Sequence, residues 1–145
     1  MANDTAFVDT SGFIALLNAD DSLLSVAARV FQQFGEERRR LVTTTWVFAE
    51  TGNGLARTRL RSQFCQAVRI ALRSDVFTLI EPDDRLFQDS LDLYEQSADK
   101  TWGLVGCCSF EVMRDRDIHF ALTADRHFEQ AGFRALLREV NTDQK

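Results

Sequence analysis

Three acidic residues of this chain stand in apolar stretches, where a purely solvating role is disfavoured. Asp9 closes the short apolar run Ala6–Val8, Glu50 lies within WVFAETG, and Asp125 comes just after IHFALT. Carboxylate oxygens are the preferred ligands of hard divalent cations such as Mg²⁺ and Mn²⁺. The set is most simply interpreted as a divalent-metal site of the kind that nucleases use.

Each of the three residues also has a simpler interpretation. Asp9 and Asp125 stand where an aspartate can cap the helix that follows, and Glu50 can project into solvent. Thr10 or Ser11 could cap the first helix instead, which would release Asp9 for another role. The metal site is therefore a hypothesis about the combination, because no single residue requires it.

Arginines form the second chemical signal. The net charge of −5 argues against nucleic acid, but the basic residues cluster as Arg38, Arg39 and Arg40, then Arg57, Arg59, Arg61, Arg69 and Arg73. The planar guanidinium donates two parallel hydrogen bonds to a phosphate. An acidic pocket beside an arginine-bearing helix is what a metal-dependent phosphodiesterase needs; the alternative is a solvated helix face.

Short apolar runs alternate with amphipathic helices along the chain. The pattern predicts strands at 6–8, 41–43, 76–80 and 118–122 and an edge strand at 133–137, separated by helices that include 10–17, 22–34, 59–73, 82–98 and 102–114. Strands separated by helices form a parallel sheet covered on both faces. Ligands bind outside the carboxyl ends of such strands. Asp9 and Asp125 both fall at strand ends of this kind.

Length and composition favour one cytoplasmic domain. We expect residues 1–145 to form a single unit with its core at about 6–137 and a frayed tail at 138–145, since there is one proline and no linker-like stretch. No window is apolar enough to span a bilayer, and the first residues lack the pattern of a secretory signal. The three cysteines have neither disulfide nor zinc spacing, so we expect reduced thiols.

Four stretches together resemble a known family. They are FVDTSGFIALLNADD, TTTWVFAETGNGLAR, DKTWGLVGCCSFEVM and HFALTADRHFEQAGF, in that order along the chain. They are similar to a PIN domain, the family of metal-dependent nucleases that includes the VapC-type toxins of bacterial toxin–antitoxin pairs. The resemblance runs from about Ala6 to Leu136, and its late pair of motifs is the specific part.

This resemblance implies a doubly wound parallel sheet of four or five strands and a pocket of four acidic residues that holds Mg²⁺ or Mn²⁺. Asp9, Glu50 and Asp125 match three of those acids, and Ser11 matches the small hydroxyl residue of the metal pocket. The fourth acid is expected before the cysteine of the late motif, where this chain has Gly106. Asp99 precedes that position by seven residues, about 10 Å along a helix, so it is a poor substitute.

Two explanations of Gly106 stay open. The aspartate was lost naturally, in a degenerate nuclease that still binds a partner, or it was replaced deliberately because an active toxin harms its host. Loss of one carboxylate lowers the negative charge that retains a cation and deletes a ligand or water-orienting group. Glycine inside a helix costs about 0.5–1 kcal/mol relative to alanine, so stability does not account for it.

The first hypothesis is a metal-dependent ribonuclease of PIN/VapC type, impaired to the extent that Gly106 matters. Arg57, Arg59 and Arg61 are the candidates for contacting RNA phosphates. Toxin membership implies an antitoxin partner and a homodimer. The alternative is a catalytically inactive PIN-fold module that binds RNA or an antitoxin-like protein, and a phosphatase of receiver-like topology is a weaker third.

Two aromatic residues near these motifs are predicted to have other roles. His127 follows Asp125 and is expected to be a surface or capping residue rather than a base. Trp102 is expected to fill the core rather than to stack on bases.

Overall fold

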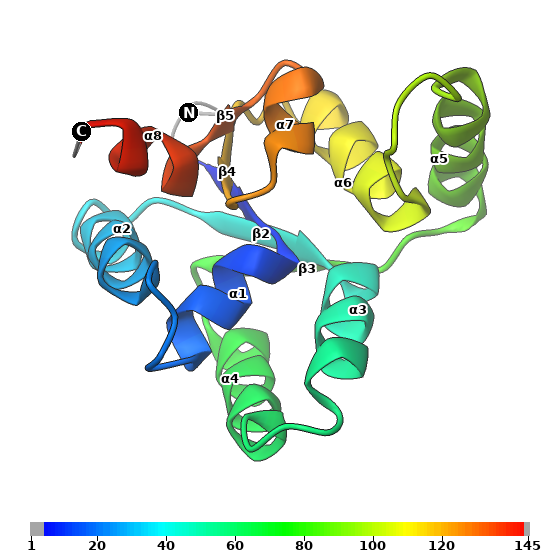
Figure 1. Ribbon diagram of the computed structural model, residues 1–145. Coiled ribbons are helices and arrows are strands. Elements are labelled where there is room, and N and C mark those ends of the chain that lie inside the picture. Colours follow the sequence, from blue (N-terminus) through cyan, green and yellow to red (C-terminus); the bar gives the residue numbers. More distant parts are fainter. Residues whose placement is uncertain (1–4, 144–145) are drawn as a thin grey trace.

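The computed structural model describes residues 5–143, and at their centre is a parallel sheet (Figure 1). Its strands are β1 (Ala6–Val8), β2 (Leu41–Thr44), β3 (Phe77–Ile80), β4 (Phe120–Leu122) and β5 (Arg134–Ala135). Their spatial order is β3-β2-β1-β4-β5, and every neighbouring pair is parallel. The predicted doubly wound sheet is confirmed, with five strands.

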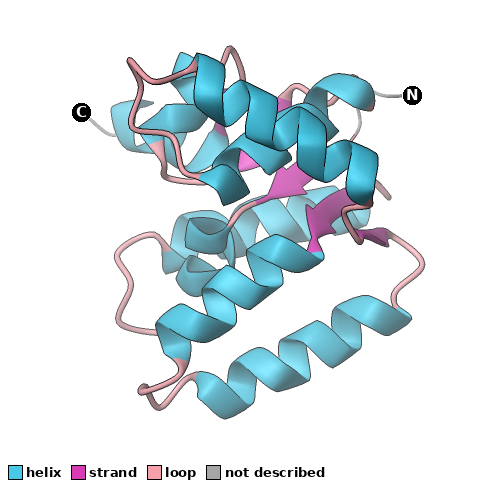
Figure 2. Cartoon of the chain, turned by 90° about the vertical axis from the view of Figure 1, so that its right-hand side faces the viewer, coloured by secondary structure: helices cyan, strands magenta, loops and turns pink. Residues whose placement is uncertain are grey.

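In the part of the chain that the structure describes, eight helices cover the two faces of the sheet. They are α1 (Thr10–Leu17), α2 (Leu24–Glu36), α3 (Thr45–Leu55), α4 (Arg61–Arg73), α5 (Asp84–Gln96), α6 (Leu104–Asp115), α7 (Arg126–Gln130) and α8 (Leu136–Asp143). In Figure 1, α1 to α4 lie below the sheet and α5 to α8 above it, and Figure 2 shows the strands between two helical layers. Crossovers between parallel strands are right-handed, so helices change face when the chain turns back from β3 to β4. Within residues 5–143, no helix has both the length and the apolar character needed to cross a membrane.

Aromatic side chains fill the space between the sheet and the upper layer. Phe7 of β1, Phe110 of α6 and Phe128 of α7 are almost completely buried. The rings of Phe110 and Phe128 meet edge to face, with 4.9 Å between their centroids. Such pairs add about 0.5–1.5 kcal/mol beyond the burial of their area. They fix α6 and α7 on the sheet, next to the strand ends where the acidic residues lie.

The chain after Gly132 differs from the prediction. The edge strand expected at 133–137 is reduced to Arg134–Ala135, and the tail expected from residue 138 is helix α8 as far as Asp143. Leu137 anchors this helix, because its side chain is fully buried. A single buried leucine in a charged stretch gives little periodicity from which to predict a helix. The last two residues of the expected tail, 144–145, lie outside the described residues.

Candidate active site

The neighbouring strands β1 and β4 bring two of the predicted acids to one edge of the sheet. The strand order reverses at β1, so the carboxyl ends of β1 and β4 flank a switch point where ligands bind in this architecture. Asp9 follows β1 and is the N-cap residue of α1, and Asp125 is the N-cap residue of α7. The capping interpretation holds for the side chain of Asp125 but not for that of Asp9, which makes no capping hydrogen bond.

A small pocket of about 100 Å³ joins these acids to the third one. Its lining consists of Asp9, Glu50, Trp102, Gly103, Gly106, Phe110, Asp125, His127 and Phe128. The structure therefore gathers Asp9, Glu50, Asp125 and Gly106 from four separate segments of the chain.

Asp9 is the most deeply buried of the three acids, with 7 % of its surface exposed. Its Oδ2 accepts a hydrogen bond of 3.1 Å from the Thr123 hydroxyl. The pKa of the Asp9 carboxyl is raised from 3.8 to about 6. Burial is the main cause, the nearby charges of Asp125 and Glu50 add to it, and hydrogen bonds to the carboxylate oppose it. The negative charges of Asp125 and Glu50 therefore repel that of Asp9, and a cation placed among the three carboxylates would relieve this repulsion.

Glu50 reaches the pocket from α3, on the opposite face of the sheet from α6. The Thr44 hydroxyl caps α3 by accepting from the Val47 N–H at 3.1 Å, which fixes the start of the helix. The Thr10 hydroxyl donates to Glu50 Oε1 at 2.9 Å, and the Thr51 hydroxyl donates to Thr10 Oγ1 at 3.1 Å. A chain of hydroxyls thus orients the one exposed carboxylate of the site.

Asp125 is held by the residue two positions after it. Its Oδ1 accepts from the His127 backbone N–H at 2.9 Å, and the His127 Nδ1 lies 3.2 Å from the same oxygen. The Asp125 N–H in turn donates to Thr123 Oγ1 at 3.0 Å. The turn after β4 is therefore closed by its own polar side chains.

Ser11 enters this network indirectly. Its hydroxyl accepts from the Ala124 N–H at 2.9 Å and lies 3.0 Å from Thr123 Oγ1. Thr123, which sequence reasoning missed, is thus the residue that connects Ser11 with Asp9. The sequence offered one signal for Thr123, a threonine directly after an apolar strand; the structure shows that this residue is fully buried.

Two more pocket residues were assigned other roles in the sequence. His127 uses its backbone N–H in the cap, as expected, but its ring is half-buried and lines the pocket. Trp102 packs edge to face on Phe110, with 5.0 Å between centroids, and also lines the pocket, so its core role is only part of its position. Neither placement could be read from local sequence, because both depend on how α6 and α7 meet.

Comparisons with known proteins agree with this architecture. No family model matches the chain, and no curated protein matches it. Among solved structures, it is similar to VapC20 of Mycobacterium tuberculosis, a toxin that cleaves the sarcin–ricin loop. The TM-score is 0.78 and the identity 28 %, over 88 % of this chain and 95 % of the other. The chain therefore has the fold of a VapC-like PIN domain.

Gly106 is the third residue of α6, where the family resemblance places an aspartate. In this VapC-like domain the first turn of α6 carries no acidic residue, and no described side chain caps the helix. A Cβ built on Gly106 would meet Phe110 Cζ at 3.9 Å as its nearest described neighbour, which is ordinary van der Waals contact. A side chain can therefore begin at this position without displacing the backbone.

The predicted phosphate-binding arginines lie elsewhere in the VapC-like domain. Arg57 and Arg59 follow the end of α3, and Arg61 begins α4, one full turn or more beyond Glu50. Arg59 pairs with Asp20 at 2.8 Å, and Arg61 donates to the Ala56 carbonyl at 3.3 Å. A separate hollow of about 550 Å³ is lined by Arg59, Arg61 and Arg69, among others. The structure does not bring these arginines to the acidic pocket.

The donor chemistry of the pocket fits Mg²⁺ or Mn²⁺, since its polar lining is dominated by carboxylate oxygens. The arrangement is not a preformed coordination shell, however. Among residues 5–143, no three His, Cys, Asp or Glu side chains converge closely enough to hold an ion. Each carboxylate is instead hydrogen-bonded to a neighbouring hydroxyl or histidine. Cation binding would therefore have to draw the three carboxylates together.

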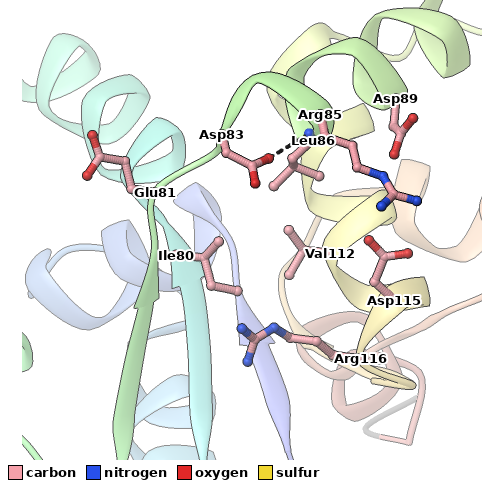
Figure 3. Close-up of a pocket in the computed structure, with 9 residues that line it drawn as sticks. All are labelled: Ile80, Glu81, Asp83, Arg85, Leu86, Asp89, Val112, Asp115 and Arg116. Atoms are coloured by element: carbon pink, nitrogen blue, oxygen red, sulfur yellow. Dashed lines mark hydrogen bonds between the residues drawn. The ribbon is translucent and has the colours of Figure 1, made fainter.

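A larger cavity of about 490 Å³ lies away from this pocket, between the end of β3, α5 and α6 (Figure 3). Its lining mixes charges of both signs: Glu81, Asp83, Arg85, Asp89, Asp115 and Arg116. Asp83 is engaged as the cap of α5, where it accepts from the Leu86 N–H at 2.8 Å. This cavity is not lined by any of the residues matched to the family's metal pocket, which are Asp9, Ser11, Glu50, Gly106 and Asp125.

Proposed function

We propose that this VapC-like domain is a ribonuclease that depends on Mg²⁺ or Mn²⁺, and that its activity is impaired by Gly106. The observation that supports this proposal is the pocket at the switch point of the sheet, which collects Asp9, Glu50 and Asp125 around Gly106. VapC20, to which the chain is similar, is an RNA-cleaving toxin.

In this proposal Asp9, Glu50 and Asp125 hold the cation, and Ser11 supports them through Thr123. When bound, a divalent cation lowers the pKa of its water and stabilises charge on the attacked phosphate. The chain's own contribution is to aim the carboxylates. Thr10 orients Glu50, Thr123 orients Asp9, and His127 orients Asp125. Arg57, Arg59 and Arg61 would hold RNA phosphates at the surface beyond α3.

Gly106 leaves this pocket without the fourth carboxylate that the family resemblance places there. A fourth carboxylate in the first turn of α6 would face the other three and would be favoured by the partial positive charge of the helix N-terminus. Without it the pocket loses one negative charge and one oxygen donor, and both losses weaken cation binding. We therefore expect the Gly106→Asp variant to bind Mn²⁺ at least about tenfold more tightly, since loss of even an outer-shell partner of a metal ligand costs about 10–100-fold in affinity.

The test is cleavage of two RNAs, a hairpin with the sarcin–ricin sequence and an unstructured RNA of mixed sequence. Four proteins are compared with Mn²⁺ and with EDTA: this chain, Gly106→Asp, Gly106→Asp combined with Asp9→Asn, and Gly103→Asp. The last is the matched control, because Gly103 is another glycine of the pocket lining. The proposal predicts metal-dependent cleavage by Gly106→Asp, much weaker cleavage by this chain, and none after Asp9→Asn. Cleavage that Asp9→Asn leaves intact would refute the assigned site.

The second candidate function is a catalytically inactive module that keeps the fold and binds RNA or an antitoxin-like protein. The absence of three converging metal-binding side chains within residues 5–143 favours it. Folded Gly106→Asp protein that neither cleaves RNA nor binds Mn²⁺ would select this alternative.

The proposed toxin character also implies partners. We propose a cytoplasmic homodimer, inhibited by an antitoxin segment that covers the acidic pocket. These partners follow from the likeness to a VapC toxin and are tested separately from catalysis, by co-purification and by the oligomeric state of the isolated chain.

A further inference from the structure

His127 touches a pocket carboxylate and also the loop that leads into α6. Its Nδ1 lies 3.2 Å from Asp125 Oδ1, and its Nε2 lies 3.0 Å from the Thr101 hydroxyl. The ring is half-buried in the pocket, beside Phe110 and Phe128. Both ring nitrogens therefore have partners on different segments of the chain.

The chemistry of these partners determines the tautomer of the neutral ring. An ionised carboxylate can only accept a hydrogen bond, so the proton of the ring must be on Nδ1. Nε2 is then an acceptor and receives the hydrogen of the Thr101 hydroxyl. The free histidine side chain in water prefers the Nε2–H tautomer, so protonation at Nδ1 would distinguish His127 from an unpaired histidine.

The two donors from His127 have a consequence for Asp125. The backbone N–H donates to Oδ1 at 2.9 Å and Nδ1 lies 3.2 Å from the same oxygen, so both contacts hold the Oδ1 side of the carboxylate. A second bond ties the same two segments together, because Trp102 Nε1 donates to Gln130 Oε1 at 3.0 Å. The loop before α6, and with it Gly103 and Gly106, is thereby held against α7.

We propose that His127 is a positioning residue of the metal pocket, which orients Asp125 through Nδ1–H and registers the α6 N-terminus through Nε2 and Thr101. The role in metal binding rests on the proposed function, but the hydrogen-bond assignment does not. Residues next to metal ligands that orient them in this way contribute about 10–100-fold to metal affinity.

The first measurement needs no metal. A long-range ¹H–¹⁵N spectrum of the metal-free chain at alkaline pH reports which nitrogen carries the proton, and the chain has only two histidines, so His119→Asn completes the assignment. We expect His127 to be protonated at Nδ1, and Asp125→Ala to return it to the Nε2–H form. An Nε2–H form in the unaltered chain would overturn the proposal.

The second measurement is Mn²⁺ affinity, by calorimetry, in the unaltered chain and in the Gly106→Asp background. The amide nitrogen of asparagine can replace Nδ1, whereas that of glutamine falls near Nε2. His127→Asn should therefore stay within about threefold of its parent, while His127→Gln and His127→Ala should bind about tenfold more weakly. Thermal unfolding of each variant separates loss of affinity from loss of fold.

The outcomes distinguish this proposal from the proposed function. Equal affinity in all three variants, or an equal loss that includes His127→Asn, would overturn the positioning role while leaving the metal pocket intact. If neither parent binds Mn²⁺, the proposed function fails, and the tautomer of His127 and its response to Asp125→Ala alone decide the hydrogen-bond assignment.

Discussion

Asp9 concentrates the electrostatic cost of the pocket in one side chain. Its carboxylate is buried and faces two others, and one hydroxyl of Thr123 compensates only in part. A raised pKa in a folded carboxyl means that ionisation favours the unfolded chain. In the absence of a cation, this residue therefore destabilises the domain at neutral pH, which is typical of groups kept for function rather than for stability.

The pH dependence of stability tests this property of Asp9. Between its ordinary pKa of 3.8 and its folded pKa of about 6, stability should fall as pH rises, because the unfolded chain ionises first. Asp9→Asn keeps the acceptor for Thr123 but removes the charge. We expect it to stabilise the domain by about 2–3 kcal/mol at pH 7.5 and by almost nothing below pH 4, measured by urea unfolding in EDTA.

Added Mn²⁺ provides the control, since it should raise the stability of the unaltered chain but not that of Asp9→Asn. An equal gain for Asn at both pH values would mean that packing, and not charge, governs the effect.

Among the elements, the junction of α1 with β4 sets the position of Asp9. A Cβ on Gly12 would lie 2.3 Å from the Leu122 carbonyl oxygen, so the first turn of α1 rests directly on the strand end. The Asp9 N–H donates to the same carbonyl at 3.3 Å. Glycine is required here by close approach of two backbones, and this contact holds Asp9 and Thr123 within hydrogen-bonding distance.

Gly12→Ala tests the junction, with Gly54→Ala as its matched control. Gly54 lies on the exposed side of α3, and a Cβ there would meet no described atom within 4 Å. We expect Gly12→Ala to destabilise the domain by about 2 kcal/mol or more, as overpacking does, and Gly54→Ala to stabilise it by about 0.5–1 kcal/mol. Chemical denaturation measures both, and similar effects of the two variants would argue against the close contact.

The elements also show what sequence could and could not predict. The ends of strands can be predicted because apolar runs stop abruptly at polar residues. Asp9 and Asp125 were therefore expected at strand ends, and both line the same pocket. Glu50 was placed in the pocket by family resemblance, since helical periodicity alone says only that it lies on α3. The places of His127 and Trp102 in the pocket lining were not predicted, because their surroundings come from α6 and α7 together. Helix α8 was missed because the charged stretch around the buried Leu137 gives little helical periodicity.

At the scale of the whole molecule, α5 presents an unpaired apolar stripe. Phe87, Leu91 and Tyr94 recur at helical spacing, and each has more than 40 % of its surface exposed. Contiguous apolar exposure of this kind marks interaction surfaces. The stripe is our candidate for the contact of the proposed homodimer.

Leu91→Glu should therefore weaken self-association, because it places a charge at the centre of the stripe. Ile70→Glu on α4 is the control, since Ile70 is even more exposed, at 63 %. Light scattering after size exclusion, at tens of micromolar protein, should give a dimer for the unaltered chain and for Ile70→Glu, and a monomer for Leu91→Glu. An unaltered chain that runs as a monomer would contradict the assignment.

Charge is also segregated across the molecule. Residues 56–74 contain five arginines and no acidic residue, whereas residues 81–99 contain seven acidic residues and one arginine. The net charge of −5 therefore conceals a basic surface around α4 and an acidic one around α5. The acidic residues around α5 would repel RNA, so we expect the proposed RNA substrate to approach from the side of α4, near Arg57 and Arg61.

Binding of RNA in EDTA, where no cleavage occurs, tests the role of this basic surface. Each phosphate contact releases counterions, so log K falls with log salt in proportion to the number of contacts. Replacing Arg57 and Arg61 by glutamine should weaken binding of a fluorescent mixed-sequence RNA and reduce the salt slope by about 1–2.

The charge-matched control replaces Arg85 and Arg116, which line the cavity between α5 and α6. It should leave the slope unchanged, because the surrounding carboxylates of Asp89 and Asp115 keep phosphate away. If both pairs lower the slope equally, net charge governs the interaction and the surface around α4 has no special role.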